Sequence, residues 1–218
     1  MLGSVRAFSI SLLIASAAGA QDMRLKIDRG QSYIVATTRK GGFLSAFGAG
    51  HEHGVLATEW SVEACMDPGA ISASRAAVVI PTASLRIDTP RARELAGLQS
   101  AGPKPSDVAT IQEKMLGPNV LAAASYPRIG FQVTEVRRNG ESGLALKGPL
   151  TIRGVTHNIS VPVSISAPGT GTYRFEGKFQ VKQTDYGMTP ESIAGAVTVK
   201  DQVDVHFVIV AAAAGPCR

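Results

Sequence analysis

Apolar and polar residues alternate along one stretch of this chain after another, and this period of two constrains the fold more than any other feature. In 159–165 the branched aliphatic residues share one parity, and serines occupy the other except at Pro162. Three further stretches follow the same rule: Leu144, Leu146, Leu150 and Ile152; Phe175, Phe179 and Val181; and Val203, Val205, Phe207 and Ile209. Because successive side chains of a strand point to opposite faces, the pattern predicts half-buried antiparallel strands.

Short connections rich in turn-forming residues separate these stretches. They include Asp67-Pro68-Gly69, Arg138-Asn139-Gly140-Glu141 and Pro168-Gly169-Thr170-Gly171. Such turns join neighbouring strands into hairpins. Earlier strand candidates lie near Ser32–Thr38, His51–Glu63, Ala73–Pro81 and Arg128–Val136. We therefore expect an all-β fold of about eight strands, closed into an antiparallel barrel without exposed edges, with a β-sandwich as the alternative.

One segment in the middle of the chain has helical spacing. Ser106-Asp107 offers an N-cap, and Gly117-Pro118 ends the run. Between them, apolar residues recur at helical intervals at Val108, Ile111, Met115 and Leu116. A loop rich in Ser, Gly and Pro, Gly97–Pro105, precedes this segment. We expect one short helix and this loop to cover an open end of the barrel.

The N-terminal residues have the order of a secretory signal peptide. Arg6 precedes an apolar run from Ala7 to Ala18, and Ala18-Gly19-Ala20 offers a cleavage site. No later apolar run reaches the roughly 20 residues of a membrane-spanning helix. We expect residues 1–20 to be removed and residues 21–218 to form one soluble domain in the periplasm or outside the cell. Gln21-Asp22-Met23 has no cysteine for lipid attachment, which favours free export.

The two cysteines, Cys65 and Cys217, lie far apart in the sequence. Export places them in a compartment where disulfides persist, so one bridge between the C-terminal end and an early strand is one interpretation. The alternative is that Cys65 is a small buried residue and Cys217 lies on a tail. The spacing does not decide between the two, because a bridge needs Cα atoms within about 7 Å.

The charge balance argues against nucleic acid as a partner. The 22 Lys and Arg residues only moderately exceed the 17 Asp and Glu residues, and they form no dense cluster. Two other associations stay open at this point: transient contact with an anionic membrane surface, and a homodimer.

Several motifs resemble those of the YceI-like family. The segment Leu150-Thr151-Ile152-Arg153-Gly154-Val155-Thr156, followed by Ile159-Ser160-Val161-Pro162-Val163, is similar to the signature hairpin of that family. Further similar segments occur in family order between about Tyr33 and Val210: Pro81-Thr82-Ala83-Ser84-Leu85, Tyr126-Pro127-Arg128-Ile129-Gly130-Phe131 and Asp185-Tyr186-Gly187-Met188. The resemblance implies a lipocalin-like barrel whose lumen binds polyisoprenoid chains or similar amphiphiles, usually in the periplasm and without an enzymatic step.

The chain is most similar to a branch of that family with three further segments. They read here Arg39-Lys40-Gly41, Gly50-His51-Glu52-His53 and Lys114-Met115-Leu116-Gly117. Lys114 stands where the branch has Asn, so a polar role at that position is not carried over, whereas Met115 and Leu116 keep the apolar one.

A lumen that holds an isoprenoid or quinone-like lipid would be lined by inward-facing apolar residues. The candidates are Leu150, Val161, Phe179 and Phe207. An apolar tail that enters a dry lumen gains about 25 cal/mol per Å² of buried area, so no catalytic group is needed. The same residues could instead pack against one another in a filled barrel.

Arg39, His51 and His53 are the candidates for meeting the polar head of such a lipid. Arg supplies a forked set of donors, and on a strand two histidines spaced by two would point to one face. The alternative is a redox-coupled module in which His51 and His53 bind a metal or haem. Glu52 would face the other way and no third ligand is evident, so we predict neither a metal site nor a cofactor.

Motifs for covalent chemistry are missing from the sequence. It contains neither a Gly-x-Ser-x-Gly elbow nor a phosphate-binding Gly-rich loop followed by Lys and Ser or Thr. Its acidic residues in turns, such as Asp67 and Glu141, are isolated. We expect a binding protein and not an enzyme.

Overall fold

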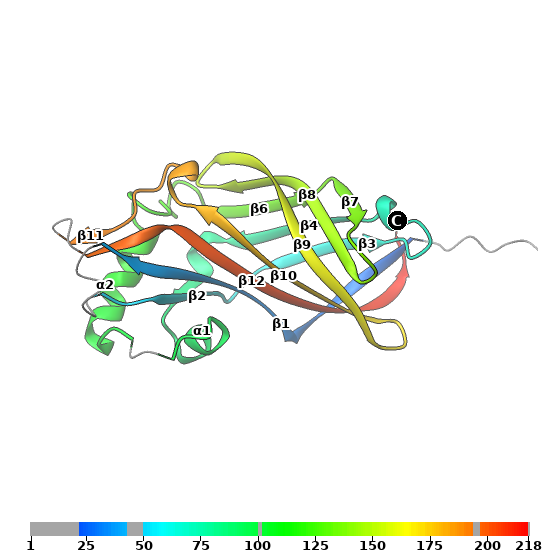
Figure 1. Ribbon diagram of the computed structural model, residues 1–218, viewed down its shortest axis with the longest axis horizontal. Coiled ribbons are helices and arrows are strands. Elements are labelled where there is room, and N and C mark those ends of the chain that lie inside the picture. Colours follow the sequence, from blue (N-terminus) through cyan, green and yellow to red (C-terminus); the bar gives the residue numbers. More distant parts are fainter. Residues whose placement is uncertain (1–21, 43–49, 100–101, 194–196, 218) are drawn as a thin grey trace, which may run out of the picture.

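The computed structural model describes residues 22–42, 50–99, 102–193 and 197–217. The predicted signal peptide lies outside the described residues. Eight strands form a closed antiparallel ring in the order β12-β10-β9-β8-β6-β4-β3-β1 (Figure 1). Their bounds are β1 Met23–Gly41, β3 Ser61–Met66, β4 Arg75–Pro81, β6 Arg128–Val133, β8 Gly143–Ile152, β9 Val155–Gly169, β10 Thr172–Lys182 and β12 Val197–Pro216.

Pairing of the first and last strands closes the ring. The β1–β12 register runs from Met23 opposite Pro216 to Gly41 opposite Thr198. A sandwich would leave these strands in separate sheets, so the predicted eight-stranded barrel is confirmed and the sandwich is excluded. The closure also removes the edge of the long strand β1.

Four short strands extend the ring: β2 His53–Ala57, β5 Leu85–Ile87, β7 Glu135–Arg138 and β11 Ser192–Ile193. The single strand expected over His51–Glu63 is wrong, because the chain divides there into β2 and β3. Thr58 lies between the two strands, and both its backbone N–H and its hydroxyl donate to the carbonyl of Ser84, at 3.2 and 2.7 Å. As a result β2 pairs with β1 and β5, while β3 pairs with β4.

The described residues form two α-helices, of which the sequence pattern indicated one. Helix α2, Pro105–Leu116, lies across the end of the barrel away from the C-terminus (Figure 1). It begins at Pro105 after Lys104, so Ser106-Asp107 is not its N-cap, and Gly117 ends it as expected. The shorter helix α1, Pro90–Leu95, was missed. In the described part of the chain, neither helix combines the length and apolar character that a membrane crossing needs.

The described residues also contain the 3-10 turns η2 Ile71–Ala73, η3 Thr82–Ser84 and η4 Thr184–Tyr186. The β8–β9 hairpin has a two-residue connection, where Ile152 pairs with Val155 across Arg153-Gly154. Both turn residues have positive φ, 49° and 73°, as a two-residue hairpin turn requires. A Cβ on Gly154 would lie 2.7 Å from the Tyr126 ring, so glycine is needed here for space as well.

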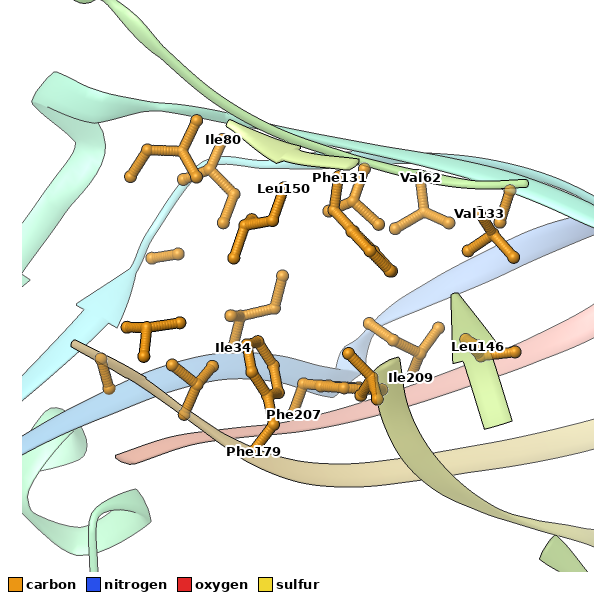
Figure 2. Close-up of a pocket in the computed structure, with 18 of the residues that line it drawn as sticks. Ile34, Val62, Ile80, Phe131, Val133, Leu146, Leu150, Phe179, Phe207 and Ile209 are labelled. Carbon is orange, nitrogen blue, oxygen red and sulfur yellow. The ribbon is translucent and has the colours of Figure 1, made fainter. Parts of the chain in front are cut away.

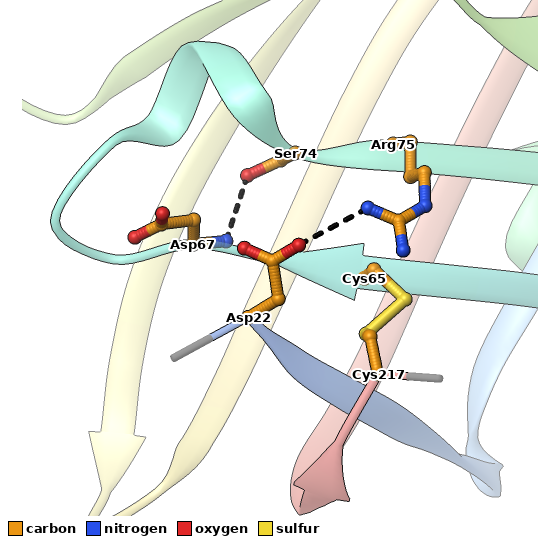
Figure 3. The surroundings of a disulfide bond; sticks show 6 residues. All are labelled: Asp22, Cys65, Asp67, Ser74, Arg75 and Cys217. Atoms are coloured by element: carbon orange, nitrogen blue, oxygen red, sulfur yellow. Dashed lines mark hydrogen bonds and ion pairs between the residues drawn. A yellow bond between two sulfur atoms is a disulfide. The ribbon is translucent and has the colours of Figure 1, made fainter. Parts of the chain in front are cut away.

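A disulfide between Cys65 and Cys217 fastens the C-terminal end of β12 to β3 (Figure 3). Their Cα atoms lie 6.1 Å apart, and the backbone N–H of Cys217 donates to the carbonyl of Asp22 at 3.0 Å. The bridge is therefore the correct one of the two interpretations of the cysteines. It lies at the end of the barrel away from α2, which we call the disulfide end.

Candidate functional site

The inside of the barrel contains a cavity of about 310 Å³. Side chains from two opposite walls of the barrel face each other across this cavity (Figure 2). One wall contributes Val62 from β3, Ile80 from β4, Phe131 from β6 and Leu150 from β8. The other wall contributes Ile34 from β1, Phe179 from β10 and Phe207 from β12. This volume lies at the lower end of the roughly 300–1,000 Å³ usual for small-molecule sites. The interior is a cavity, so the filled-barrel alternative is wrong for this fold.

Hydrocarbon side chains dominate the lining. The polar or charged lining residues within the described chain are Thr38, Ser74, Arg75 and Gln183. Gln183 is buried, and its side-chain amide donates to the carbonyl of Lys200 at 2.9 Å. A cavity with so few polar partners cannot hold an ordered chain of water, and apolar cavities of this kind take apolar ligands.

The cavity has two different ends. At the α2 end, Met115 of the helix and the buried residues Val120 and Leu121 after it contribute to the lining. The Leu121 N–H donates to the carbonyl of Met115 at 3.1 Å, which folds this segment back under the helix. At the disulfide end the lining includes Cys65, Ser74 and Arg75, and the Arg75 side chain is 54% exposed. Arg75 is next to the inward-facing Ala76 on β4, so strand alternation turns its exposed side chain to the outer face.

All four apolar residues proposed for the lumen lie in the lining: Leu150, Val161, Phe179 and Phe207. Their role in binding stays a prediction. The position of the Phe207 ring requires glycine at position 177, which the sequence pattern did not single out. A Cβ on Gly177 would lie 2.5 Å from the Phe207 ring. Glycine at this inward position lets the aromatic ring lie against β10 and so leaves space beside it.

Arg39 lies on the outer surface, not in the cavity lining. Thr38 lines the cavity, and strand alternation turns Arg39 to the opposite face. There its guanidinium contacts the carboxylates of Asp204 at 3.1 Å and Glu52 at 3.3 Å. The structure thus does not bring Arg39 to the cavity as proposed.

The histidine pair is also not arranged as expected. Strand β2 begins at His53, so the exposed His51 precedes the strand and shares no strand face with it. Neither residue lines the cavity. Within the described residues, no three His, Cys, Asp or Glu side chains gather in an arrangement that could hold a metal. The other two histidines have separate partners: His157 contacts the Asp185 carbonyl and His206 contacts Glu176, each at 2.9 Å.

Sequence reasoning missed a buried ionic cluster around Asp88, directly after β5. Only 1% of the Asp88 side chain is exposed, and its carboxylate lies 2.5 Å from Nδ1 of His53 and 2.8 Å from Nη1 of Arg93. The Gly54 N–H also donates to it, at 3.2 Å. Burial acts to raise the pKa of Asp88, but its hydrogen bonds with His53, Arg93 and the Gly54 N–H, together with the electrostatic effect of His53, outweigh it and hold the pKa below its ordinary value. The cluster joins β2 and β5 to α1.

The segment Asp88-Thr89-Pro90 contains a sequence signal for the start of helix α1 beside this cluster. The Thr89 hydroxyl accepts from the Ala92 N–H at 3.1 Å and Pro90 occupies the first turn, which is a standard helix start. Helix α1 then packs closely on β2, because a Cβ on Gly54 would lie 2.7 Å from the Ala92 carbonyl oxygen.

Replacement of Asp88 by Asn is expected to lower the free energy of unfolding by about 3 kcal/mol at neutral pH, since it removes the buried carboxylate that pairs with Arg93 and is hydrogen-bonded to His53. The folded pKa lies below the unfolded value, so this contribution is complete above the unfolded pKa of about 3.9 and is lost as the pH falls through the folded value. Urea unfolding of both proteins between neutral pH and acid pH measures it.

Asp204→Asn is the matched control for that variant. Asp204 pairs with Arg39 on the outer surface, with side chains 35% and 42% exposed, so its loss should cost less than about 1 kcal/mol. If Asp88→Asn cost no more than Asp204→Asn, or if the difference persisted in acid, the structural role assigned to the cluster would be wrong.

Fold and cavity together define a lipocalin-like β-barrel with an apolar interior. A family model described as "YceI-like domain" matches residues 25–211, and the chain belongs to the YceI-like family. The chain is 32% identical over 80 residues to the UPF0312 proteins of Yersinia pestis and Yersinia pseudotuberculosis. These alignments cover 34% of this chain and 41% of each relative.

Solved structures share the fold at low sequence identity. Burkholderia cenocepacia BcnA is 19% identical with a TM-score of 0.63, covering 85% of this chain and 99% of BcnA. The Campylobacter jejuni YCEI protein is 18% identical with a TM-score of 0.56, covering 74% and 85%. A Saccharophagus degradans domain described as polyisoprenoid binding is 13% identical with a TM-score of 0.58, covering 89% and 100%.

Proposed function

We propose that this protein is a non-enzymatic carrier that holds the tail of an isoprenoid lipid inside its barrel. The observation that carries the proposal is the hydrocarbon-lined cavity of about 310 Å³ between the two walls of the barrel. The description of the Saccharophagus degradans domain as polyisoprenoid binding supports the same ligand class. The carrier releases its lipid unchanged.

The energetics favour a long branched tail. Each buried CH₂ group contributes about 0.8 kcal/mol, and one five-carbon isoprene unit therefore contributes up to about 4 kcal/mol. Branched aliphatic and aromatic side chains form most of the cavity lining and offer contact area with few competing polar groups. The polar head gains nothing from this lining, so it stays at an end of the cavity where water reaches it.

We place the carrier in the periplasm. The signal-peptide pattern of residues 1–20 supports export. The Cys65–Cys217 bridge supports an oxidising compartment, because disulfides persist there and are rare in the cytosol. A carrier in this location would move or store lipids between the membranes that border it.

Delipidated protein titrated with isoprenoid quinones and polyprenyl phosphates of increasing length is expected to bind saturably. The dissociation constant should fall by at least about tenfold for each added isoprene unit until the cavity is full, because each unit buries further hydrocarbon. Intrinsic fluorescence or calorimetry measures the series. The free head groups without tails serve as the control and should not bind; saturable binding of no isoprenoid at any length would refute the proposed function.

A further inference from the structure

We infer that helix α2 and the segment after it form the floor of the barrel cavity, and that Met115 and Leu121 in this floor set the tail length that the protein prefers. This inference rests on the proposed function and adds a chain-length specificity to it. Its basis is a difference between the two ends of the cavity. Side chains from two fixed segments lie across the α2 end, whereas a second cavity adjoins the disulfide end.

The floor consists of apolar side chains from two segments that are distant in the sequence. Met115, Val120 and Leu121 line the cavity from α2 and the residues after it, at the end that α2 covers (Figure 1). Met188 lines it from the connection that follows β10. Val120, Leu121 and Met188 are buried. A tail that extends along the cavity toward α2 therefore ends against these side chains.

Helix α2 is fastened to the barrel by the side chain of Gln112. The Gln112 amide nitrogen donates to the carbonyl of Leu85 at 2.9 Å. Its amide oxygen accepts from the Ile87 N–H, also at 2.9 Å. Both partners belong to β5, which pairs with β2. Because one side chain makes both bonds with a strand, the helix is held at a fixed distance from the barrel wall.

Two further hydrogen bonds hold the segment after α2. The Arg153 guanidinium, in the β8–β9 turn, donates to the carbonyl of Pro118 at 2.7 Å. The Thr189 N–H donates to the carbonyl of Asn119 at 2.8 Å, which joins this segment to the one that contains Met188. The floor is thus attached to β5, to the β8–β9 turn and to the connection after β10, and it forms a fixed stop.

A fixed stop in an apolar cavity favours one tail length. A shorter tail leaves apolar space without contact, and a longer tail keeps carbons outside the cavity that gain no burial. Met115 and Met188 have flexible, unbranched side chains that adapt to irregular shapes, so they can fit the branched end of the tail. Their backbone stays where the hydrogen bonds hold it.

The disulfide end has no comparable stop among the described residues. The second cavity there measures about 170 Å³, and its lining shares Met66, Ile71 and Leu144 with that of the main cavity. Space therefore continues past the main cavity at this end. Excess tail extends in this direction, so the length is measured from the floor at α2.

The test uses delipidated, disulfide-bonded protein and polyprenyl phosphates that differ by one isoprene unit. For the wild type, the dissociation constant should fall with each unit and stop falling at one length, which we call the length limit. Met115→Ala combined with Leu121→Ala removes about six heavy atoms, close to the five carbons of one unit, so the limit should rise by one unit. The tail one unit above the wild-type limit should bind this variant at least about tenfold more tightly than the wild type. Tails too short to reach the floor should bind both proteins equally.

Ile111→Ala combined with Leu116→Ala is the matched control. Both residues belong to α2, are half-buried and pack on the same apolar core, but neither lines the cavity. The control removes a similar amount of side chain from the same helix, so the length limit should not change.

Leu121→Phe gives an independent readout of the opposite sign. The larger side chain fills space at the floor, so the limit should fall. The tail at the wild-type limit should then bind at least about tenfold more weakly, while short tails keep their affinity. Circular dichroism and melting curves identify the variants that fold, and the enlarged and the filled floor each test the inference without the other.

The outcomes separate the two claims. Binding of no tail of any length by the wild type would refute the proposed function. An unchanged limit in folded Met115→Ala with Leu121→Ala, or a shifted limit in the control, would overturn the inference alone. A wild-type dissociation constant that falls over the whole series would also overturn it, because the tail would then pass the floor.

Discussion

Replacement of Ala76 by Phe is expected to weaken isoprenoid binding at least about 100-fold. Ala76 lines the cavity, where it pairs with Ala64 on one side and Val133 on the other. These small side chains leave room that a phenyl ring would fill. The space lost is similar to one isoprene unit, which contributes up to about 4 kcal/mol of burial. Titration of delipidated protein with one polyprenyl phosphate measures the change.

Ala77→Phe is the matched control for the blocked cavity. Ala77 is the next residue of β4, is absent from the cavity lining, and pairs with Glu63 and Gln132. The same side chain is added to the same strand but on the other face, so the affinity should change less than about threefold. Overpacking costs about 1–3 kcal/mol, so both variants need an unfolding curve. Equal affinities of a folded Ala76→Phe protein and the wild type would place the ligand elsewhere.

Removal of the Cys65–Cys217 bridge is expected to lower the free energy of unfolding by about 4 kcal/mol. The cysteines are 152 residues apart, and a bridge that closes so long a loop restricts the unfolded chain strongly. The double variant Cys65→Ser with Cys217→Ser removes the bridge without leaving a free thiol. Guanidinium unfolding of this variant and the wild type gives the difference.

Reduced wild-type protein provides the control for the serine substitutions. It should unfold at the same denaturant concentration as the double variant, because both lack only the cross-link. A loss of stability below about 1 kcal/mol would show that the bridge contributes little to the folded state.

The sequence predicted the parts of this fold that local pattern determines. Residues such as Val161 and Phe207 could be placed on an inner face because strand alternation records burial directly. The turn at Pro168-Gly169-Thr170-Gly171 could be recognised because it depends on adjacent turn-forming residues, and Gly169 pairs with Thr172 across it. The number of ring strands followed from counting these local units.

Features that depend on pairing between distant segments were not predicted. The break of His51–Glu63 into two strands results from the contact of Thr58 with Ser84, which no local pattern shows. The cluster around Asp88 forms because β2, β5 and α1 meet. Arg39 was proposed for the cavity, and only the structure shows that it lies on the outer face in contact with Asp204 and Glu52.

Native mass spectrometry of the protein purified from an exporting host tests the central claim most directly. We predict a non-covalent adduct that solvent extraction releases and that fragments as an isoprenoid lipid, on a protein whose mass corresponds to a chain without residues 1–20 and with one disulfide. Loss of this adduct in Ala76→Phe and its retention in Ala77→Phe would place the lipid in the cavity. A bare protein mass, or an adduct that consists only of a metal ion, would contradict the carrier account.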